Sequence, residues 1–214
     1  MSILNEISEF LQKGRAAKIK ELVPQALEQG IEPQVILEDA LLSGMSIIGE
    51  KFKKNEVFVP EVLVAARAMN AGVDILRPHL ISSGVTTKGT AILGTVKGDL
   101  HDIGKNIVKM MLEGKGLEVI DLGVDVPANV FVEKAIEHNA KVICCSALLT
   151  TTMNEMKEVV NKAIEAGIRD KVKIMVGGAP LTQSFCDSIG ADYYTPDASS
   201  ASEVALKICL NEAI

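Results

Sequence analysis

Apolar residues in the first third of the chain recur every three or four positions, which is the period of an amphipathic α-helix. Glycines and prolines divide this stretch into four predicted helices, over residues 3–13, 17–29, 33–54 and 60 to about 80. Pro24 falls inside the second helix and should kink or divide it, because proline has no backbone N–H. Four helices joined by short loops predict an antiparallel bundle over residues 1–83.

Beyond residue 83 the pattern changes to short apolar runs that alternate with amphipathic segments. Strands are expected at residues 91–96, 118–122, 141–147, 172–176 and 192–194, with helices at 104–112, 128–138, 154–166, 182–188 and 199–211. This alternation predicts an α/β fold with a doubly wound, five-stranded parallel sheet and right-handed crossovers. The predicted domains are therefore a helical domain (1–83), a small polar linker (84–89) and a sheet domain (90–214).

The composition narrows the classes of partner. The chain has 214 residues, a net charge of -6 and no densely basic stretch, which argues against nucleic acid. With five Phe, two Tyr and no Trp, it offers little surface for stacking bases. No apolar run approaches the ~18 residues of a membrane helix, and the N-terminus does not resemble a signal peptide. We therefore expect no membrane association and a cytoplasmic location.

The four cysteines do not form a C-x-x-C pair. We expect them to be reduced and mostly buried, with Cys144 and Cys145 pointing to opposite faces of a strand because they are adjacent. A zinc site or a disulfide framework is the alternative.

Polar segments follow four of the predicted strands. In an open parallel sheet, ligands bind beyond the carboxyl ends of the strands. The segments at those ends are residues 97–104, 146–152, 177–180 and 196–199. Together they carry one histidine, two aspartates close to it, several hydroxyls and several glycines, so we expect a polar and sterically open ligand site at this edge.

Two phosphate-based interpretations fit this edge poorly. In place of a phosphate loop, five residues separate Gly98 from Gly104, and Asn106 follows Lys105 where Ser or Thr is required. A phosphorylated receiver domain needs an aspartate after the third strand, where Ser146 stands.

A third interpretation makes His101 a metal ligand. Asp99, two residues earlier, could accept the second ring N–H of such an imidazole. One histidine cannot hold a bare ion, but it can bind a metal that arrives already ligated by a macrocycle. The alternative is a loop histidine paired with a surface aspartate, and the spacing leaves both open. His79 and His138, by contrast, are expected at the C-terminal ends of helices.

Three separated motifs resemble those of the B12-binding domains: Asp99-x-His101-x-x-Gly104, Ser146-x-Leu148 and Gly177-Gly178. The loop over residues 98–106 is similar to that of cobalamin-dependent methionine synthase and of the small corrinoid proteins of methyltransferase systems. The helical region resembles their cap in the runs Gly49-Glu50-Lys51-Phe52, Phe58-Val59-Pro60-Glu61 and Ala66-Arg67-Ala68-Met69. The similarity covers nearly the whole chain and implies a four-helix cap joined to a Rossmann-like or flavodoxin-like B12-binding domain.

The resemblance also implies the contacts of the sheet domain with the cofactor. His101 would replace the dimethylbenzimidazole of the cofactor as the lower cobalt ligand, and Asp99 would hydrogen-bond the imidazole and share its proton. Thr152 stands where methionine synthase has a serine, and it keeps the hydroxyl that completes this triad. The other contacts to the corrin or its displaced nucleotide tail would be Gly98, Leu100, Asp102, Ile103, Gly104, Ser146, Leu148, Thr150, Gly177, Gly178 and Ala198.

In the cap, three positions match residues that face the corrin. Glu38 matches a corrin contact, Phe52 matches the aromatic residue that covers the methyl face, and Val59 stands where methionine synthase has a leucine. An ordinary core position is the alternative for Phe52 and Val59.

The resemblance implies a methyl carrier rather than an enzyme that acts alone. The cofactor would be cobalamin or a related corrinoid, cycling between methylcob(III)alamin and cob(I)alamin. The partners would be a substrate methyltransferase for a methylamine, a betaine or a similar donor, an acceptor methyltransferase for tetrahydrofolate or coenzyme M, and a reductive activase for Co(II). The linker would act as a hinge that lets the cap move when a partner docks. The alternative function is a B12-dependent sensor or regulatory module.

Overall fold

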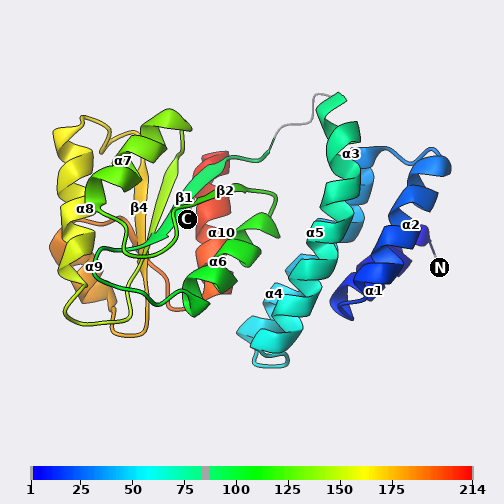
Figure 1. The fold of residues 1–214 in the computed structure, drawn as a ribbon, viewed down its shortest axis with the longest axis horizontal. Coiled ribbons are helices and arrows are strands. Elements are labelled where there is room, and N and C mark those ends of the chain that lie inside the picture. Colours follow the sequence, from blue (N-terminus) through cyan, green and yellow to red (C-terminus); the bar gives the residue numbers. More distant parts are fainter. Residues whose placement is uncertain (1, 83–86, 214) are drawn as a thin grey trace. The chain divides into compact units, whose positions relative to one another are not determined.

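The computed structural model describes residues 2–82 and 87–213, and the chain divides into two compact units (Figure 1). The first unit contains the helices up to Thr87, and the second begins at Lys88. Residues 84–86 of the predicted linker lie outside the described residues. The two-part organisation agrees with the sequence, while the limits of the linker stay a prediction.

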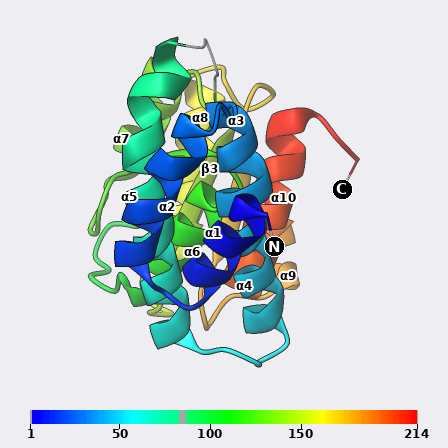
Figure 2. The same cartoon turned by 90° about the vertical axis from the view of Figure 1, so that its right-hand side faces the viewer.

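The first unit is entirely helical. Its elements are α1 (Ile3–Gln12), α2 (Ala16–Glu28), α3 (Pro33–Val35), η1 (Ile36–Leu42), α4 (Ser43–Lys53) and α5 (Val59–Ser82). Helices α2 and α5 pack side by side, and α1 packs on both α2 and α4 (Figures 1 and 2). Their shared core is aliphatic, with Ile7, Leu11, Ile19, Val23 and Leu41 fully buried.

Two details of the helical unit differ from the prediction. Pro24 is expected to kink or divide the second helix, and α2 continues through it, so division is wrong and a kink stays a prediction. The burial of Leu22, Val23 and Ala26 around it stabilises the helix beyond the one hydrogen bond that proline removes. The predicted helix over residues 33–54 contains seven π-helical residues in η1, which the apolar period alone does not reveal.

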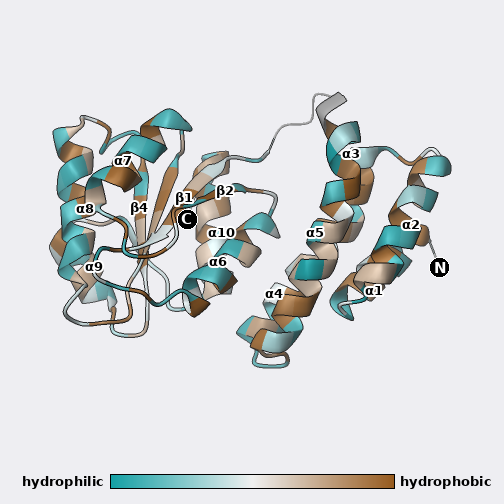
Figure 3. Cartoon of the chain, in the orientation of Figure 1, coloured by the Kyte–Doolittle hydropathy of each residue, from teal (hydrophilic) through white to brown (hydrophobic). Residues whose placement is uncertain are grey.

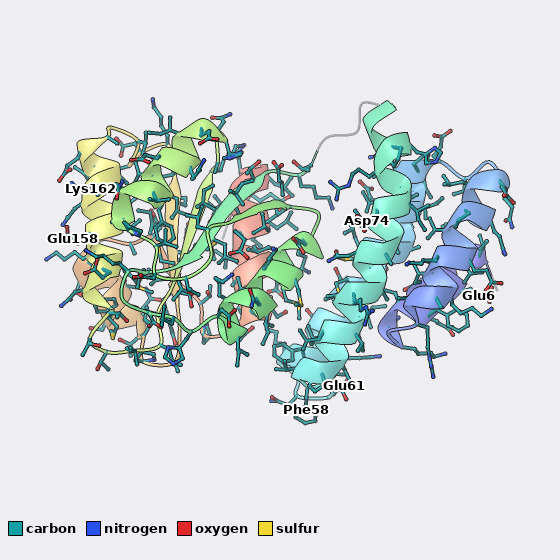
Figure 4. All side chains as sticks on the ribbon, viewed as in Figure 1. Glu6, Phe58, Glu61, Asp74, Glu158 and Lys162 are labelled. Carbon is teal, nitrogen blue, oxygen red and sulfur yellow. The ribbon has the colours of Figure 1, made fainter. Side chains whose placement is uncertain are left out.

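Helix α5 begins one residue before Pro60. The backbone N–H of Phe58 donates a hydrogen bond of 3.0 Å to Glu61 Oε2, and both residues lie at the α4–α5 turn in Figure 4. This is the backward half of a capping box, in which the glutamate at the third helical position satisfies the N–H of the cap residue.

The second unit is a five-stranded, all-parallel sheet in the order β2-β1-β3-β4-β5. The strands are β1 (Thr90–Thr95), β2 (Glu118–Asp121), β3 (Val142–Ser146), β4 (Lys173–Gly177) and β5 (Tyr193–Tyr194). The helices are α6 (Ile103–Glu113), α7 (Ala128–Glu137), α8 (Asn154–Glu165), α9 (Gln183–Ile189) and α10 (Ala198–Leu210). The predicted fold class is confirmed, and each predicted strand and helix is present to within a few residues.

Helices cover both faces of the sheet. Helices α7, α8 and α9 enclose one core around Ile92 and Phe131, and α6 and α10 enclose a second core around Leu93 and Leu112. Figure 3 shows the matching pattern, with hydrophobic strands and hydrophilic outer faces of the helices. The chain runs from β1 outward to β2 and then crosses back past β1 to form β3, so the reversal of strand order lies between β1 and β3. Ligand sites of such sheets lie at this reversal.

The cysteines behave as the sequence predicts. All four are buried free thiols, and Cys144 and Cys145 belong to the cores on opposite faces of the sheet. Burial raises the pKa of Cys144 to about 12, so this thiol stays protonated and packs as an apolar side chain. Within residues 2–82 and 87–213, no helix is long and apolar enough to cross a membrane.

Candidate functional site

The site begins with a tight turn at the carboxyl end of β1. The backbone N–H of Asp99 donates to the carbonyl of Val96 over 3.1 Å, which closes a four-residue turn. Gly98, at the third position of this turn, has a φ of 80°, as a type II turn requires. A Cβ at Gly98 would lie 3.4 Å from Thr152 Cγ2, so the backbone angle rather than lack of space demands glycine.

After this turn, the carboxylate of Asp99 is surrounded by hydrogen-bond donors from two loops. The side chain is fully buried. Its Oδ2 accepts the backbone N–H groups of Leu148 (2.7 Å) and Leu149 (3.1 Å) and lies 2.9 Å from the hydroxyl of Thr152. Its Oδ1 accepts the backbone N–H of His101 over 3.1 Å and lies 2.7 Å from the imidazole Nδ1. The β3–α8 loop is thus joined to the loop of His101 through one carboxylate.

These donors decide the charge of Asp99. Burial by itself would raise the pKa of the carboxyl group, but the hydrogen bonds from Leu148, His101 and Leu149 outweigh burial and hold the pKa well below its usual range. Asp99 is therefore ionised at neutral pH. Because an ionised carboxylate can only accept hydrogen bonds, Nδ1 of His101 must be the nitrogen that carries the proton.

The remaining ring nitrogen of His101 is free to bind a ligand. With the proton on Nδ1, the neutral imidazole has its lone pair on Nε2, and about half of the side chain (49%) is exposed. The hydroxyl of Thr95 donates to the carbonyl of His101 over 2.9 Å, which fixes the main chain of the loop as well. The geometry therefore presents one oriented nitrogen donor at the edge of the sheet.

The hydroxyl of Thr152 has two hydrogen-bond acceptors within reach, one of which is the carboxylate of Asp99. Its hydroxyl oxygen lies 2.9 Å from Asp99 Oδ2 and 2.9 Å from the carbonyl oxygen of Leu149. A hydroxyl has a single proton, so it donates to one of these acceptors at a time. The hydrogen bond from Thr152 to Asp99 is available without moving any heavy atom.

The β3 and β4 ends line the site beside this triad. Ser146 ends β3 and lies next to Gly177 of β4 and Thr95 of β1. Gly178 has a φ of 141°, and a Cβ there would overlap the carbonyl oxygen of Ala147. Close packing between these two loops is therefore sufficient to require glycine at this position, whatever approaches it from outside.

Most other predicted residues of the sheet domain surround His101 at the same edge. Leu100 and Ile103 are large hydrophobic residues with 71% and 74% of their surface exposed, and Leu148 and Thr150 are exposed as well. Asp102 accepts a side-chain hydrogen bond of 3.1 Å from Asn106 in the first turn of α6, in which Gly104 also lies. Ala198 is buried at the start of α10.

The three predicted cap residues lie in the helical unit. Glu38 is exposed in η1 and accepts a hydrogen bond of 3.2 Å from Gln34. Phe52 in α4 and Val59 at the start of α5 are both half-buried. Their roles toward a cofactor stay predictions.

The structure adds contacts that the sequence analysis missed. Leu149 contributes through its backbone N–H, and such a contact leaves no mark in the sequence. Lys105 is buried and bonded to Asp121 Oδ1 over 2.6 Å, and Asp125 accepts the N–H of Gly98. The position of Asp125 shortly after a predicted strand was the available signal for its role, because that strand ends at the same edge as the loop of His101.

These residues fit a planar cofactor that brings its own metal. A single imidazole, held on one side by an ionised aspartate, offers Nε2 as one axial ligand. The exposed apolar side chains of Leu100, Ile103 and Leu148 provide surface for a large ring compound. The fold and the site thus define an α/β cofactor-binding domain with one aspartate-supported histidine for a metal.

Comparison with known proteins identifies the family. Models of the B12 binding domain match residues 89–205 and, in a second form, residues 3–77. The chain is 46% identical to trimethylamine corrinoid protein 1 of Methanosarcina acetivorans over 88% of this chain and 87% of that protein. It is 44% identical to dimethylamine corrinoid protein 2 of the same organism, over 98% and 97% of the two chains. The chain belongs to the family of B12-binding corrinoid proteins, and its cofactor is a corrinoid.

A solved structure supports the same family. The methanol:cobalamin methyltransferase complex MtaBC of Methanosarcina barkeri contains a chain that superposes with a TM-score of 0.87 at 32% identity. The superposition covers 97% of this chain and 79% of that one.

Proposed function

We propose that this protein carries a methyl group on the cobalt of its corrinoid, between a methyltransferase that takes the group from a methylated amine and a second methyltransferase that passes it to an acceptor. The observation that carries the proposal is the Asp99–His101 pair, with its short Nδ1–Oδ1 distance of 2.7 Å and its half-exposed imidazole. The amine donor is supported by the trimethylamine and dimethylamine corrinoid proteins, which are similar to the chain over almost their full length.

A bound corrinoid supplies a cobalt centre that accepts and releases a methyl group. Toward it, His101 would present Nε2 to the cobalt, while Asp99 would fix the tautomer of the ring. When Nε2 is not bound to metal, it can hold a proton. Because its pKa is held low, Asp99 stays ionised and stabilises the resulting imidazolium, so the proton rests on the imidazole.

The other residues of the site orient and enclose the cofactor. Thr152 and the two backbone N–H groups of the β3–α8 loop hold Asp99 in place. Ser146, Thr150 and the Gly177–Gly178 turn would contact the nucleotide tail. In the helical unit, Glu38 would contact the corrin while Phe52 and Val59 exclude water from the methyl face.

The methyl-transfer partners follow from this role. One is a methyltransferase specific for the amine, and the other uses tetrahydrofolate or coenzyme M as the acceptor. A reductive activase would return oxidised Co(II) to the active state. We place the protein in the cytoplasm, and we assign the linker over residues 84–89 the hinge that lets a partner reach the cofactor.

Transfer of a labelled methyl group tests the proposal. The chain is reconstituted with cobalamin, reduced and incubated with trimethylamine, dimethylamine or monomethylamine carrying a carbon-13 methyl group, together with a methyltransferase for that amine. The proposal predicts labelled methyl on the protein-bound corrinoid and its passage to an added acceptor methyltransferase. A chain that binds cobalamin but takes no methyl from any donor would instead be a B12-dependent sensor, and would contradict the proposal.

Two histidine variants make the test specific. His101→Ala removes the lower ligand and should lower the transfer rate strongly. His138→Ala is the matched control, because this histidine caps α7 and contacts Glu137 in the same unit. It should transfer methyl groups at the rate of the wild-type protein.

A further inference from the structure

Asp125 lies in the β2–α7 loop and holds the loop of His101 from the side opposite the β3–α8 loop. Its Oδ1 accepts the backbone N–H of Gly98 over 2.6 Å, and its own backbone N–H donates to the carbonyl oxygen of Asp99 over 2.9 Å. The next residue, Val126, forms a parallel bridge with Val96, which keeps the two loops in register. Asp125 therefore bonds to the last two residues of the turn, Gly98 and Asp99.

The backbone of Asp125 is in an unfavourable conformation. Its φ is 53°, in the left-handed region that residues other than glycine rarely adopt. Aspartate tolerates this region better than most residues, yet the conformation costs energy relative to glycine. In this conformation the N–H and the carboxylate of Asp125 both bond to the Gly98–Asp99 segment.

We infer that Asp125 is a positioning residue for the axial histidine, acting through the Gly98–Asp99 turn. The inference rests on the proposed function of His101. The backbone of Asp99 is fixed at its N–H by Val96 and at its carbonyl by Asp125. These two backbone bonds add to the donors that hold the Asp99 carboxylate, which keeps Nδ1 of His101 in one hydrogen bond and Nε2 in one direction. Loss of the Gly98 bond lets the turn rotate, and the imidazole then loses its fixed orientation.

Nuclear magnetic resonance of the cofactor-free chain, labelled with nitrogen-15 in its histidines, tests the inference. At a pH where the imidazole is neutral, the wild-type protein should show His101 as a single tautomer with the proton on Nδ1. Asp125→Gly removes the acceptor and relieves the left-handed backbone, so the protein should stay folded. We expect this variant to show mixed tautomers at His101 and about tenfold faster amide exchange at Gly98, the loss expected for one charge-assisted hydrogen bond.

Two further variants separate the hydrogen bond from its alternatives. Asp125→Asn keeps an acceptor oxygen and tolerates the same φ, and should restore the single tautomer. Asn139→Gly is the matched control, because Asn139 has a φ of 48° after α7 and takes no part in the site. It should leave His101 unchanged. Should Asp125→Gly not fold, Asp125→Ala removes the same acceptor, and Asn139→Ala controls for the strain of alanine at a left-handed φ.

The experiment distinguishes a failure of the inference about Asp125 from a failure of the proposed function. A single Nδ1–H tautomer in folded Asp125→Gly overturns the inference, and so does an Asp125→Asn variant that is as disordered at His101 as Asp125→Gly. Hydroxocobalamin is then added to each variant, and the visible spectrum reports whether an imidazole binds cobalt. If even the wild-type protein shows no such ligand, the proposed function fails, while the tautomer result still decides the role of Asp125.

Discussion

At the scale of single residues, the carboxylate of Asp99 has the most specific hydrogen-bonding requirements in the site. Its two carboxylate oxygens receive hydrogen bonds from the backbones of His101, Leu148 and Leu149, and both His101 Nδ1 and the Thr152 hydroxyl lie within hydrogen-bond distance. A neutral amide cannot serve all of these, because its NH₂ group would face donors. Asp99 therefore connects the stability of the loops to the orientation of the His101 imidazole.

Asp99→Asn should lower the free energy of unfolding by about 3 kcal/mol at pH 7, because buried donors lose a charged acceptor. The folded-state pKa lies below the value near 3.8 of the unfolded chain, so this stabilisation is complete above the unfolded pKa. It is lost as the pH falls toward the folded-state pKa. Urea denaturation at several pH values should show the difference from wild type shrinking in acid.

The control for this series is Asp102→Asn. Asp102 lies in the same loop but is exposed and bonds only to Asn106 among the described residues. Its substitution should change the free energy of unfolding by less than about 0.5 kcal/mol. A cost of Asp99→Asn that stays constant down to pH 2 would contradict the assigned low pKa.

Thr152 tests how much the hydroxyl contributes to the same network. Thr152→Ser keeps the hydroxyl and should be nearly neutral, whereas Thr152→Val should cost about 1 kcal/mol of stability. Thermal unfolding of the cofactor-free chain measures both. Equal stability of the serine and valine variants would mean that the hydrogen bond to Asp99 contributes nothing measurable.

At the scale of secondary-structure elements, a buried ion pair joins α6 to the end of β2. Lys105 is 3% exposed, and its ammonium group lies 2.6 Å from Asp121 Oδ1. Burial would raise the pKa of Asp121, but the hydrogen bond from Lys105 and the N–H of Gly123 hold it below the usual range. Because α6 directly follows the loop of His101, this pair fixes where the loop ends.

Asp121→Asn should therefore destabilise the protein by about 3 kcal/mol, since it leaves the Lys105 ammonium buried without a carboxylate. The double variant Lys105→Met/Asp121→Asn removes the unpaired charge and should recover part of this loss. Urea denaturation gives both values. Lys162→Met is the control, because its pair with Glu165 lies on the exposed surface of α8, where Figure 4 labels Lys162. If Asp121→Asn is as stable as the double variant or more stable, the unpaired Lys105 charge is not the cause of the loss.

Helix α4 allows a second comparison between two of its own residues. Phe52 is half-buried and Met45 is fully buried in the helical core. Met45→Ala should lower the free energy of unfolding by roughly 2–5 kcal/mol, as is typical when a cavity forms in the core. Phe52→Ala should lower it clearly less. If Phe52 covers the methyl face, photolysis of bound methylcobalamin should also speed up in Phe52→Ala. Unchanged photolysis in a stable variant would leave Phe52 an ordinary packing residue.

The order and type of the elements in the sheet unit could be predicted because each apolar run and each amphipathic segment has a distinct period. The helical details could not. Burial on both sides of Pro24 outweighs its local preference, and the π-helical turns of η1 share their apolar faces with an ordinary helix. In the site, the pairing of Asp99 with His101 could be predicted from their spacing, and Thr152 from the resemblance to methionine synthase. The backbone donors Leu148 and Leu149 are set by the loop conformation, which no side chain encodes.

At the scale of the whole molecule, the sequence pattern, the sheet order and the family agree on one architecture. A helical unit and a flavodoxin-like unit each have their own core, and His101 lies at the strand reversal of the second. Such a division suits a carrier, because the cofactor domain can keep its ligand set while different enzymes approach it. We predict that His101 binds the cobalt of the corrinoid.

Electron paramagnetic resonance of the Co(II) form tests that claim most directly. The chain is labelled with nitrogen-15 in its histidines and reconstituted with cobalamin of natural isotope content. We expect hyperfine coupling from one nitrogen-15 nucleus, which should be lost in His101→Ala and kept in His138→Ala. Coupling from the nitrogen-14 of dimethylbenzimidazole in the wild-type protein would contradict this prediction, because the base of the cofactor would then occupy the position assigned to His101.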